Sequence, residues 1–348
     1  MKILFVGSTR GTACSLHYFT SLVRLGHSVL PFDPEYFVAR NPIERLMIRS
    51  RKAPTPAKVV QVGQSLMRLA RENTFDIVFV MAENFLGYQT IEEIRRISRR
   101  PPLFLYHSHD NNFSEGICKP KNFEETIRSY DFMFTTKSQN VRRYQELGQT
   151  QSHFIPSAYE PTVHHPIIEP YSQFSGEPFE VTFVGTYDKS RDEILDAVGW
   201  ERLHIWGNGW KHSPNYPAHR ERITPSAIYF YEFADVISHS QCALGLLRAE
   251  AADLHTQRTF EIPACGALQI APRTEEILSF FDEDKQIVCY GSLEELRDKT
   301  EYFLNHSVQR RKIAQQGHER CVLGKHTYVD RVSQMLAIAN EKKLAVAL

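Results

Sequence analysis

Short apolar runs alternate with helical segments along this chain, and the alternation runs through two separate stretches. A continuous apolar run such as 3–6 is typical of a strand covered on both faces, and residues 16–25 carry apolar side chains at helical spacing. Strands joined through helices are parallel. The pattern therefore predicts an α/β protein with doubly wound sheets. We expect strands at 3–6, 28–32, 75–80, 102–107, 132–135, 179–184, 203–206, 242–247 and 267–271.

A proline-rich stretch separates the two series of strands and indicates a linker. Its prolines are Pro156, Pro161, Pro166, Pro170 and Pro178. We expect an N-terminal Rossmann-like domain over 1–162, the linker over 163–178 and a C-terminal Rossmann-like domain over 179–330. A helix over 331–348 follows and can cross back to the N-terminal domain. Ligands of such sheets bind beyond the carboxyl ends of the strands, which predicts a cleft between the two domains.

Charge and composition exclude several classes of protein. The 348 residues carry 41 Lys and Arg and 41 Asp and Glu, so the net charge of zero excludes chain-wide electrostatic binding of nucleic acid. No apolar run approaches the roughly 18 residues of a membrane span, and the first run is too short for a signal peptide. The six cysteines lack a C-x-x-C spacing. We therefore expect a cytoplasmic protein with reduced cysteines.

The segment 40–58 departs from this charge balance. Six basic side chains face a single acidic one, Glu44. The simpler interpretation is a solvated basic loop and helix. The alternative is a patch that contacts an anionic acceptor, or lies peripherally on the inner face of a membrane.

The strongest functional pattern lies in one short segment of the C-terminal half. Pro263 is tolerated in a helix only in the first turn, so we expect a short helix that begins near Phe260 and ends at Gly266. Its free N–H groups would form an anion site, and Arg258 can bind a phosphate with two hydrogen bonds. Glu261 can accept two hydrogen bonds from a vicinal diol such as ribose. The segment fits a nucleoside diphosphate, and a capped core helix is the alternative.

Glycines follow several other predicted strands, where they let the backbone approach a ligand closely. Basic side chains follow one of these glycines and add positive charge. Each pattern by itself also fits a plain turn. The residues concerned are Gly7, Ser8 and Gly11 in the N-terminal half, and Gly185, Lys189, Arg191, Gly207, Asn208 and Gly209 in the C-terminal half.

Several separated motifs occur in a fixed order in the C-terminal half. They are Phe-Val-Gly at 183–185 with Arg191, the run from Arg258 to Gly266, the tail segments 293–296 and 309–314 with Gly317, and His-Thr-Tyr at 326–328 with Arg331. In this order they resemble the CgeB-like glycosyltransferases, a branch of the GT-B superfamily named after spore maturation protein B. The resemblance covers roughly 180–336. It implies the GT-B fold, two Rossmann-like domains that face each other across a cleft.

The resemblance implies transfer of a sugar from a nucleoside diphosphate sugar to an acceptor hydroxyl of a glycan, a lipid-linked glycan or a protein. The donor would lie on the C-terminal domain and the acceptor on the N-terminal one, which is only generically similar to a GT-B acceptor domain. A UDP-sugar is the expected donor, with GDP- and dTDP-sugars as alternatives. The superfamily generally works without a bound metal, and we expect no cofactor.

The resemblance also implies roles for individual residues. Related family 4 retaining glycosyltransferases carry two glutamates eight positions apart, which match Glu261 and, with an aspartate in place of a glutamate, Asp253. Glu261 would bind the ribose, Asp253 would face the donor sugar or its phosphates, and the anomeric configuration would be retained. The implied donor-binding residues are Gly185, Thr186, Lys189, Arg191, Gly207, Asn208, Arg258, Thr259, Phe260 and Glu261, and the acceptor-binding ones are Gly7, Ser8 and Gly11.

Histidines and an aspartate follow a predicted strand of the N-terminal half. Related enzymes place a histidine of this domain close to the donor sugar, which implies a catalytic role for His107 or His109, and Asp110 could act as general base. Metal binding by the two histidines and a plain polar loop are the alternatives. His164 and His165 lie in the expected linker, and we interpret them as incidental.

Three other functions remain to be compared with glycosyl transfer. A nucleotide-sugar epimerase on the same fold would convert the donor without an acceptor. A noncatalytic nucleotide-sugar-binding assembly protein would bind the donor and leave it intact. A Rossmann oxidoreductase is less favoured, because the glycines at 7 and 11 lack the third glycine of the dinucleotide motif and no ribose-binding acid is evident.

Overall fold

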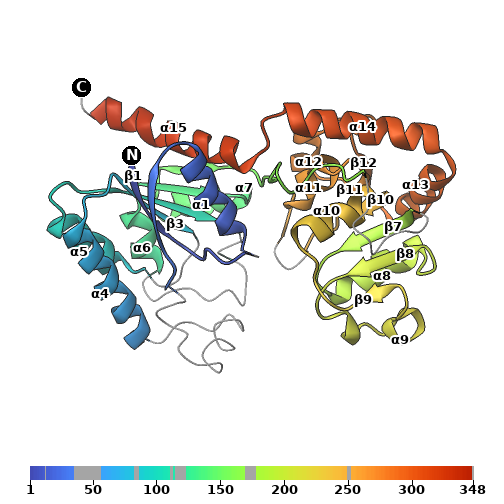
Figure 1. Cartoon of the computed structure of the whole chain (residues 1–348), viewed down its shortest axis with the longest axis horizontal. Coiled ribbons are helices and arrows are strands. Elements are labelled where there is room, and N and C mark those ends of the chain that lie inside the picture. Colours follow the sequence, from blue (N-terminus) through green and yellow to red (C-terminus); the bar gives the residue numbers. More distant parts are fainter. Residues whose placement is uncertain are drawn as a thin grey trace. The chain divides into compact units, whose positions relative to one another are not determined.

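The computed structural model describes residues 1–11, 13–34, 56–81, 86–109, 113, 123–168, 178–248 and 252–346. The chain forms two compact units (Figure 1). The first comprises Met1–Pro156 and Tyr328–Leu348, and the second comprises Ser157–Thr327. The stretch expected to be a linker therefore begins inside the second unit, and the last helix belongs to the first.

The first unit is built on a six-stranded parallel sheet of order β2-β1-β3-β4-β5-β6. Every residue of β3 is buried, as the continuous apolar run predicts for a strand covered on both faces. The strands are β1 (Lys2–Val6), β2 (Ser28–Phe32), β3 (Ile77–Met81), β4 (Leu103–Ser108), β5 (Phe132–Thr135) and β6 (Ser152–Phe154). The helices are α1 (Cys14–Arg24), α4 (Pro56–Glu72), α5 (Tyr88–Ile97), α6 (Phe123–Ser129), α7 (Ser138–Glu146) and α15 (Tyr328–Val346).

The second unit repeats this plan with a six-stranded parallel sheet of order β12-β11-β10-β7-β8-β9. Its strands are β7 (Phe179–Val184), β8 (Leu203–Trp206), β9 (Ile223–Thr224), β10 (Ser240–Leu244), β11 (Leu268–Pro272) and β12 (Val288–Tyr290). Its helices are α8 (Lys189–Val198), the 3₁₀ turn η1 (Trp210–His212), α9 (Tyr216–His219), α10 (Phe230–Ser238), α11 (Arg258–Ala264), α12 (Glu275–Phe280), α13 (Leu293–Asn305) and α14 (Ser307–Leu323). The predicted α/β class with doubly wound sheets is confirmed.

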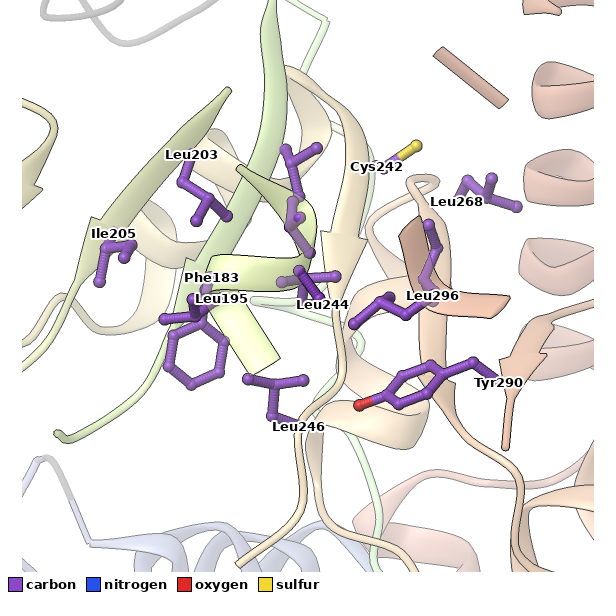
Figure 2. Packing of buried hydrophobic residues seen from close by; sticks show 14 of the residues in the cluster. Phe183, Leu195, Leu203, Ile205, Cys242, Leu244, Leu246, Leu268, Tyr290 and Leu296 are labelled. Atoms are coloured by element: carbon purple, nitrogen blue, oxygen red, sulfur yellow. The ribbon is translucent and has the colours of Figure 1, made fainter. Parts of the chain in front are cut away.

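Helices cover both faces of the second sheet. Because side chains alternate along a strand, Phe183 of β7 packs on one face with Leu195 of α8 and Leu296 of α13 (Figure 2). Val184 points to the opposite face and packs with Phe233 of α10. β7 thus contributes to two separate apolar layers, one on each face of the sheet.

The order of strands reverses once in each sheet. In the second unit the chain adds β8 and β9 on one side of β7 and then returns to place β10 on the other side. In the first unit the reversal lies between β1 and β3. Sheets of this kind bind ligands outside the carboxyl ends of the strands at this reversal. The fold therefore predicts one ligand-binding position in each unit.

The C-terminal residues form three helices. The expected helical tail over about 293–340 is divided into α13, α14 and α15, and α15 packs against α1 (Figure 1). Across the described ranges, no helix combines the length and the apolar composition that crossing a membrane requires.

Candidate functional site

Several of the residues expected to bind the donor lie at the strand reversal of the second unit. Gly185 and Thr186 directly follow β7, and Arg258 begins α11, which follows β10 in the chain. Arg258 also reaches the end of β7, since its Nε donates to the carbonyl oxygen of Val184 at 3.3 Å. The guanidinium therefore lies just beyond the carboxyl ends of two neighbouring strands, as the fold predicts for a ligand site.

Arg258 and Glu261 form an ion pair inside this site. Arg258 Nη1 donates to Glu261 Oε2, and the arginine Cζ lies 4.1 Å from the centroid of the Phe233 ring. The Glu261 residue is only 5% exposed. A buried carboxylate is stable only with a close partner, so Arg258 neutralises Glu261 and holds one of its two oxygens.

His164 lies on the other oxygen of the same carboxylate. Its Nε2 is 3.7 Å from Glu261 Oε1, and both side chains are 6% exposed. The imidazole also packs edge-on against Phe233, with ring centroids 5.6 Å apart. His164, interpreted from the sequence as incidental, therefore lies against a residue of the candidate site. The only sequence signal was a histidine among linker prolines, and the contact with Glu261 comes from the tertiary fold.

Arg191 adds a second guanidinium, and this one is buried. Its residue is 6% exposed, its Nη1 donates to the carbonyl oxygen of Thr186, and its Cζ lies 5.1 Å from the Phe183 ring centroid. Burial lowers the pKa of Arg191, and the positive charges of Arg248 and Arg258 act in the same direction. Among the described residues, the buried Nε of Arg191 has no hydrogen-bond partner. An anion at this position would relieve the repulsion and satisfy the free donor.

Asp253 faces the same group of arginines. It is 6% exposed, and Arg248 Nε donates to its Oδ2 at 3.0 Å. Its negative charge opposes the lowering of the Arg191 pKa, so Asp253 lies within electrostatic range of that guanidinium. Lys189, the first residue of α8, is exposed and lies in the turn capped by Asp188, which accepts from Ser190 N at 2.8 Å.

The glycines beyond β7 and β8 allow the two loops to approach each other. A Cβ on Gly207 would lie 1.9 Å from the carbonyl oxygen of Gly185, so no other residue fits at position 207 without a backbone shift. The carbonyl of Gly185 accepts from Trp210 Nε1 at 2.8 Å. Asn208 is exposed, and its Oδ1 accepts from Ala227 N at 3.2 Å. In the described chain these residues shape the loop that follows β8.

The helix α11 differs from its prediction. It begins at Arg258 instead of near Phe260, and Pro263 lies inside it. The N–H groups of Thr259, Phe260 and Glu261 donate to carbonyl oxygens of the preceding turn at 2.9–3.1 Å, so the expected cluster of free N–H groups does not form there. The Phe260 side chain is fully buried and stacks on His326, with centroids 4.7 Å apart. Charged side chains, not helix N–H groups, therefore dominate the electrostatics of the site.

The two histidines after β4 lie in different environments. His107 is fully buried, its Nε2 lies 2.9 Å from Tyr18 Oη, and burial lowers its pKa well below the usual range. It is a neutral core histidine, because Tyr18 and the sheet enclose it. His109 is only partly buried, and its ring centroid is 4.6 Å from that of His107. Of the two, His109 is the one that solvent reaches, and Asp110 lies outside the described residues.

The loop after β1 lies at the strand reversal of the first unit. Ser8 Oγ is 3.4 Å from Asp33 Oδ2, and the Ser8 carbonyl accepts from Ser15 Oγ at 2.5 Å. Gly7 is buried, with its N–H donating to the carbonyl of Phe32 at 3.0 Å, whereas Gly11 is exposed. Sequence reasoning missed the buried Asp33, which is 6% exposed. The basic stretch 40–58 lies almost entirely outside the described residues.

Comparison with known proteins supports this architecture. Residues 189–337 match a family model described as glycosyl transferase-like. No curated protein matches the chain by sequence. Among solved structures, sucrose-phosphate synthase from Thermosynechococcus elongatus has a TM-score of 0.70 at 13% identity, covering 99% of this chain and 100% of that one. HepE from Anabaena, in complex with UDP and glucose, has a TM-score of 0.66 at 12% identity, covering 98% and 100%.

An epimerase is also similar in fold. A putative UDP-N-acetylglucosamine 2-epimerase from Listeria monocytogenes has a TM-score of 0.60 at 10% identity, covering 99% of this chain and 97% of that one. At these identities the likeness concerns the fold. The chain therefore has the GT-B fold, and its residues 189–337 carry the sequence pattern of the glycosyl transferase-like family.

Proposed function

We propose that this protein is a glycosyltransferase that moves a sugar from a nucleoside diphosphate sugar to an acceptor hydroxyl. The observation that carries the proposal is the group formed by buried Arg191, buried Glu261 and half-buried Arg258 at the strand reversal of the second unit, within the segment that matches the glycosyl transferase-like model. Two guanidiniums suit a diphosphate, and a fixed carboxylate suits the ribose diol.

Each charged residue then has a chemical role. Arg191, with its free buried Nε, and Arg258 stabilise the negative charge that develops on the departing diphosphate. Because these cations supply the charge, the transfer proceeds without a metal ion. Glu261 binds the ribose hydroxyls, and Asp253 faces the donor sugar or its phosphates. Lys189, on the exposed first turn of α8, adds long-range attraction for the anionic donor.

The donor is a UDP-sugar and the acceptor is a glycan or glycoconjugate. HepE, which shares the fold, binds UDP and glucose, and this supports a uridine donor here. The acceptor binds the first unit near Gly7, Ser8 and Gly11, and His109 approaches the reacting sugar. The eight-residue spacing of Asp253 and Glu261 favours retention of the anomeric configuration. NMR of the product anomer tests this assignment, and an inverted product would contradict it.

Nucleotide binding tests the donor site directly. A thermal-shift and calorimetry panel of UDP, GDP, dTDP, CMP, ADP and NAD compares the wild type with Glu261→Gln and with the exposed control Glu294→Gln. A ligand at 100 times its Kd stabilises the protein by about 2.7 kcal/mol, an easily measured shift. We expect UDP to stabilise the wild type and the control and to lose most of its effect in Glu261→Gln. The same UDP affinity in all three proteins would refute the site.

Turnover separates transfer from the other two functions. Wild-type protein is incubated with UDP-glucose or UDP-N-acetylglucosamine, with and without a panel of oligosaccharide acceptors, and the sugars are followed by NMR. A glycosyltransferase forms a new glycosidic bond only when an acceptor is present. Conversion of the donor to an epimer without acceptor would identify an epimerase, to which the fold is also similar. Tight UDP binding without any conversion would identify a noncatalytic binding protein.

A further inference from the structure

A short turn fixes the protonation state of His164. The N–H of Glu160 donates to His164 Nδ1 at 3.0 Å, and the Glu160 carbonyl accepts from His164 N at 2.7 Å. A nitrogen that accepts a hydrogen bond from a backbone N–H cannot itself carry a proton. The imidazole is therefore neutral, with its proton on Nε2. That Nε2 is the atom 3.7 Å from Glu261 Oε1.

The carboxylate of Glu261 is thus approached on both oxygens by different groups. Arg258 donates to Oε2, and the Nε2–H of His164 lies beside Oε1. Both groups pack on Phe233, one with its guanidinium over the ring and the other edge-on.

We propose that His164 is a positioning residue for the nucleotide ribose, acting through Glu261. The inference rests on the proposed function, since it assumes that Glu261 binds the diol. At 3.7 Å the Nε2–Oε1 separation exceeds hydrogen-bond length, so His164 acts on the carboxylate through the dipole of its Nε2–H. Arg258 alone would let the Glu261 carboxylate rotate, and His164 limits this rotation. Because the imidazole is neutral, it does not compete with the guanidiniums for the donor phosphates.

The ligand itself supplies the sharpest test. Calorimetry compares UDP with 2′-deoxy-UDP, and GDP with 2′-deoxy-GDP, so that each pair differs by one ribose hydroxyl. The proteins are the wild type, His164→Phe, His164→Gln and the exposed neighbour His165→Phe. Phenylalanine keeps the ring packing but removes the Nε2–H, whereas glutamine keeps a donor near the same place. The measured quantity is the ratio of the two Kd values within a pair.

We expect the wild type to prefer the ribonucleotide on the order of tenfold, the value of one hydrogen bond to a charged group. His164→Phe should lose most of this preference, His164→Gln should recover it in part, and His165→Phe should keep it. A merely structural role would weaken both nucleotides of a pair equally and leave the ratio unchanged, and this result overturns the inference. If the wild type shows no preference, or Glu261→Gln does not change it, the ribose site of the proposed function fails and the role of His164 fails with it.

Discussion

Each unit buries ionisable side chains and stabilises them in a different way. In the second unit, Glu261 is 5% exposed and Arg191 6%, and neither group would be stable there without the partners described above. The first unit solves the same problem differently, because His107 is buried without charge and Tyr18 Oη lies 2.9 Å from its Nε2. In these two cases the buried charges lie where an anionic ligand is proposed, and the neutral imidazole lies where it packs against Tyr18.

Of the two contacts that Glu261 makes with Arg258 and His164, the sequence allowed the prediction of the first only. Arg258 and Glu261 lie three positions apart on one short helix, so their proximity follows from local geometry. His164 reaches Glu261 only because Ser157–Thr327 folds as one unit, and no local pattern reports such a contact. The burial that distinguishes His107 from His109 is likewise a property of the assembled sheet and of α1.

His107 makes the stability of the first unit depend on pH. Burial lowers its pKa well below the usual 6.5, so the folded chain stays unprotonated at acidic pH while the unfolded chain takes up a proton. The stabilisation is present above pH 6.5 and falls below it by about 1.4 kcal/mol per pH unit. Urea unfolding at pH 7.5, 6.5 and 5.5 should show this loss. It should be smaller in His107→Gln and unchanged in the exposed control His165→Gln; equal slopes in all three proteins would contradict it.

Among the elements, α11 holds the charged residues, and its position depends on α14. His318 of α14 donates from Nδ1 to the carbonyl oxygen of Ala264, the last residue of α11, at 3.0 Å. Gly266, with a φ of 84°, ends the helix as the sequence predicted. The start of α11 was predicted too late. The preceding turn already supplies helical hydrogen bonds, so the helix begins at Arg258 and Pro263 lies beyond its first turn.

A glycine on α14 permits this close packing. A Cβ on Gly317 would lie 2.3 Å from the carbonyl oxygen of Gln286 and 3.8 Å from Pro263 Cβ. We expect Gly317→Ala to destabilise the protein by about 1–3 kcal/mol, because the backbone on one side must move. The matched control is Gly87→Ala, where a Cβ meets nothing within 4 Å. Urea denaturation midpoints measure the stability of both variants. An unchanged midpoint for Gly317→Ala would mean that the backbone near Gln286 moves without loss of stability, which would contradict the prediction.

For the whole molecule, the long apolar strands were predictable and the short ones were not. β5, β7 and β8 have the expected bounds, because apolar residues predominate in each of these segments of four to six residues, as in a strand covered on both faces. β6, β9 and β12 have only two or three residues each, and sheet pairing, not sequence pattern, defines them. Strand order, and with it the position of the reversal that carries the site, depends on this pairing.

The end of the chain completes the unit formed by its beginning. Buried residues of α15 recur at helical spacing and pack in the first unit, where Tyr328 lies edge-on to Tyr18 at a centroid distance of 5.1 Å. They are Tyr328, Val332, Met335, Leu336 and Ala339. Folding of the first unit therefore requires residues separated from it in the chain by the whole of the second.

This arrangement predicts that a substitution in α15 lowers the stability of the first unit. Met335 is fully buried, so Met335→Ala should cost about 2–5 kcal/mol, and Gln334→Ala, at an exposed position beside it, should cost little. Calorimetric unfolding with and without UDP shows which unit loses stability. The proposed donor site lies in the second unit, so UDP should stabilise only the unfolding transition of that unit. The mutation should lower the other transition and leave the UDP-dependent shift intact. If it lowered the UDP-sensitive transition instead, α15 would stabilise the second unit and the assignment of the chain end to the first would be wrong.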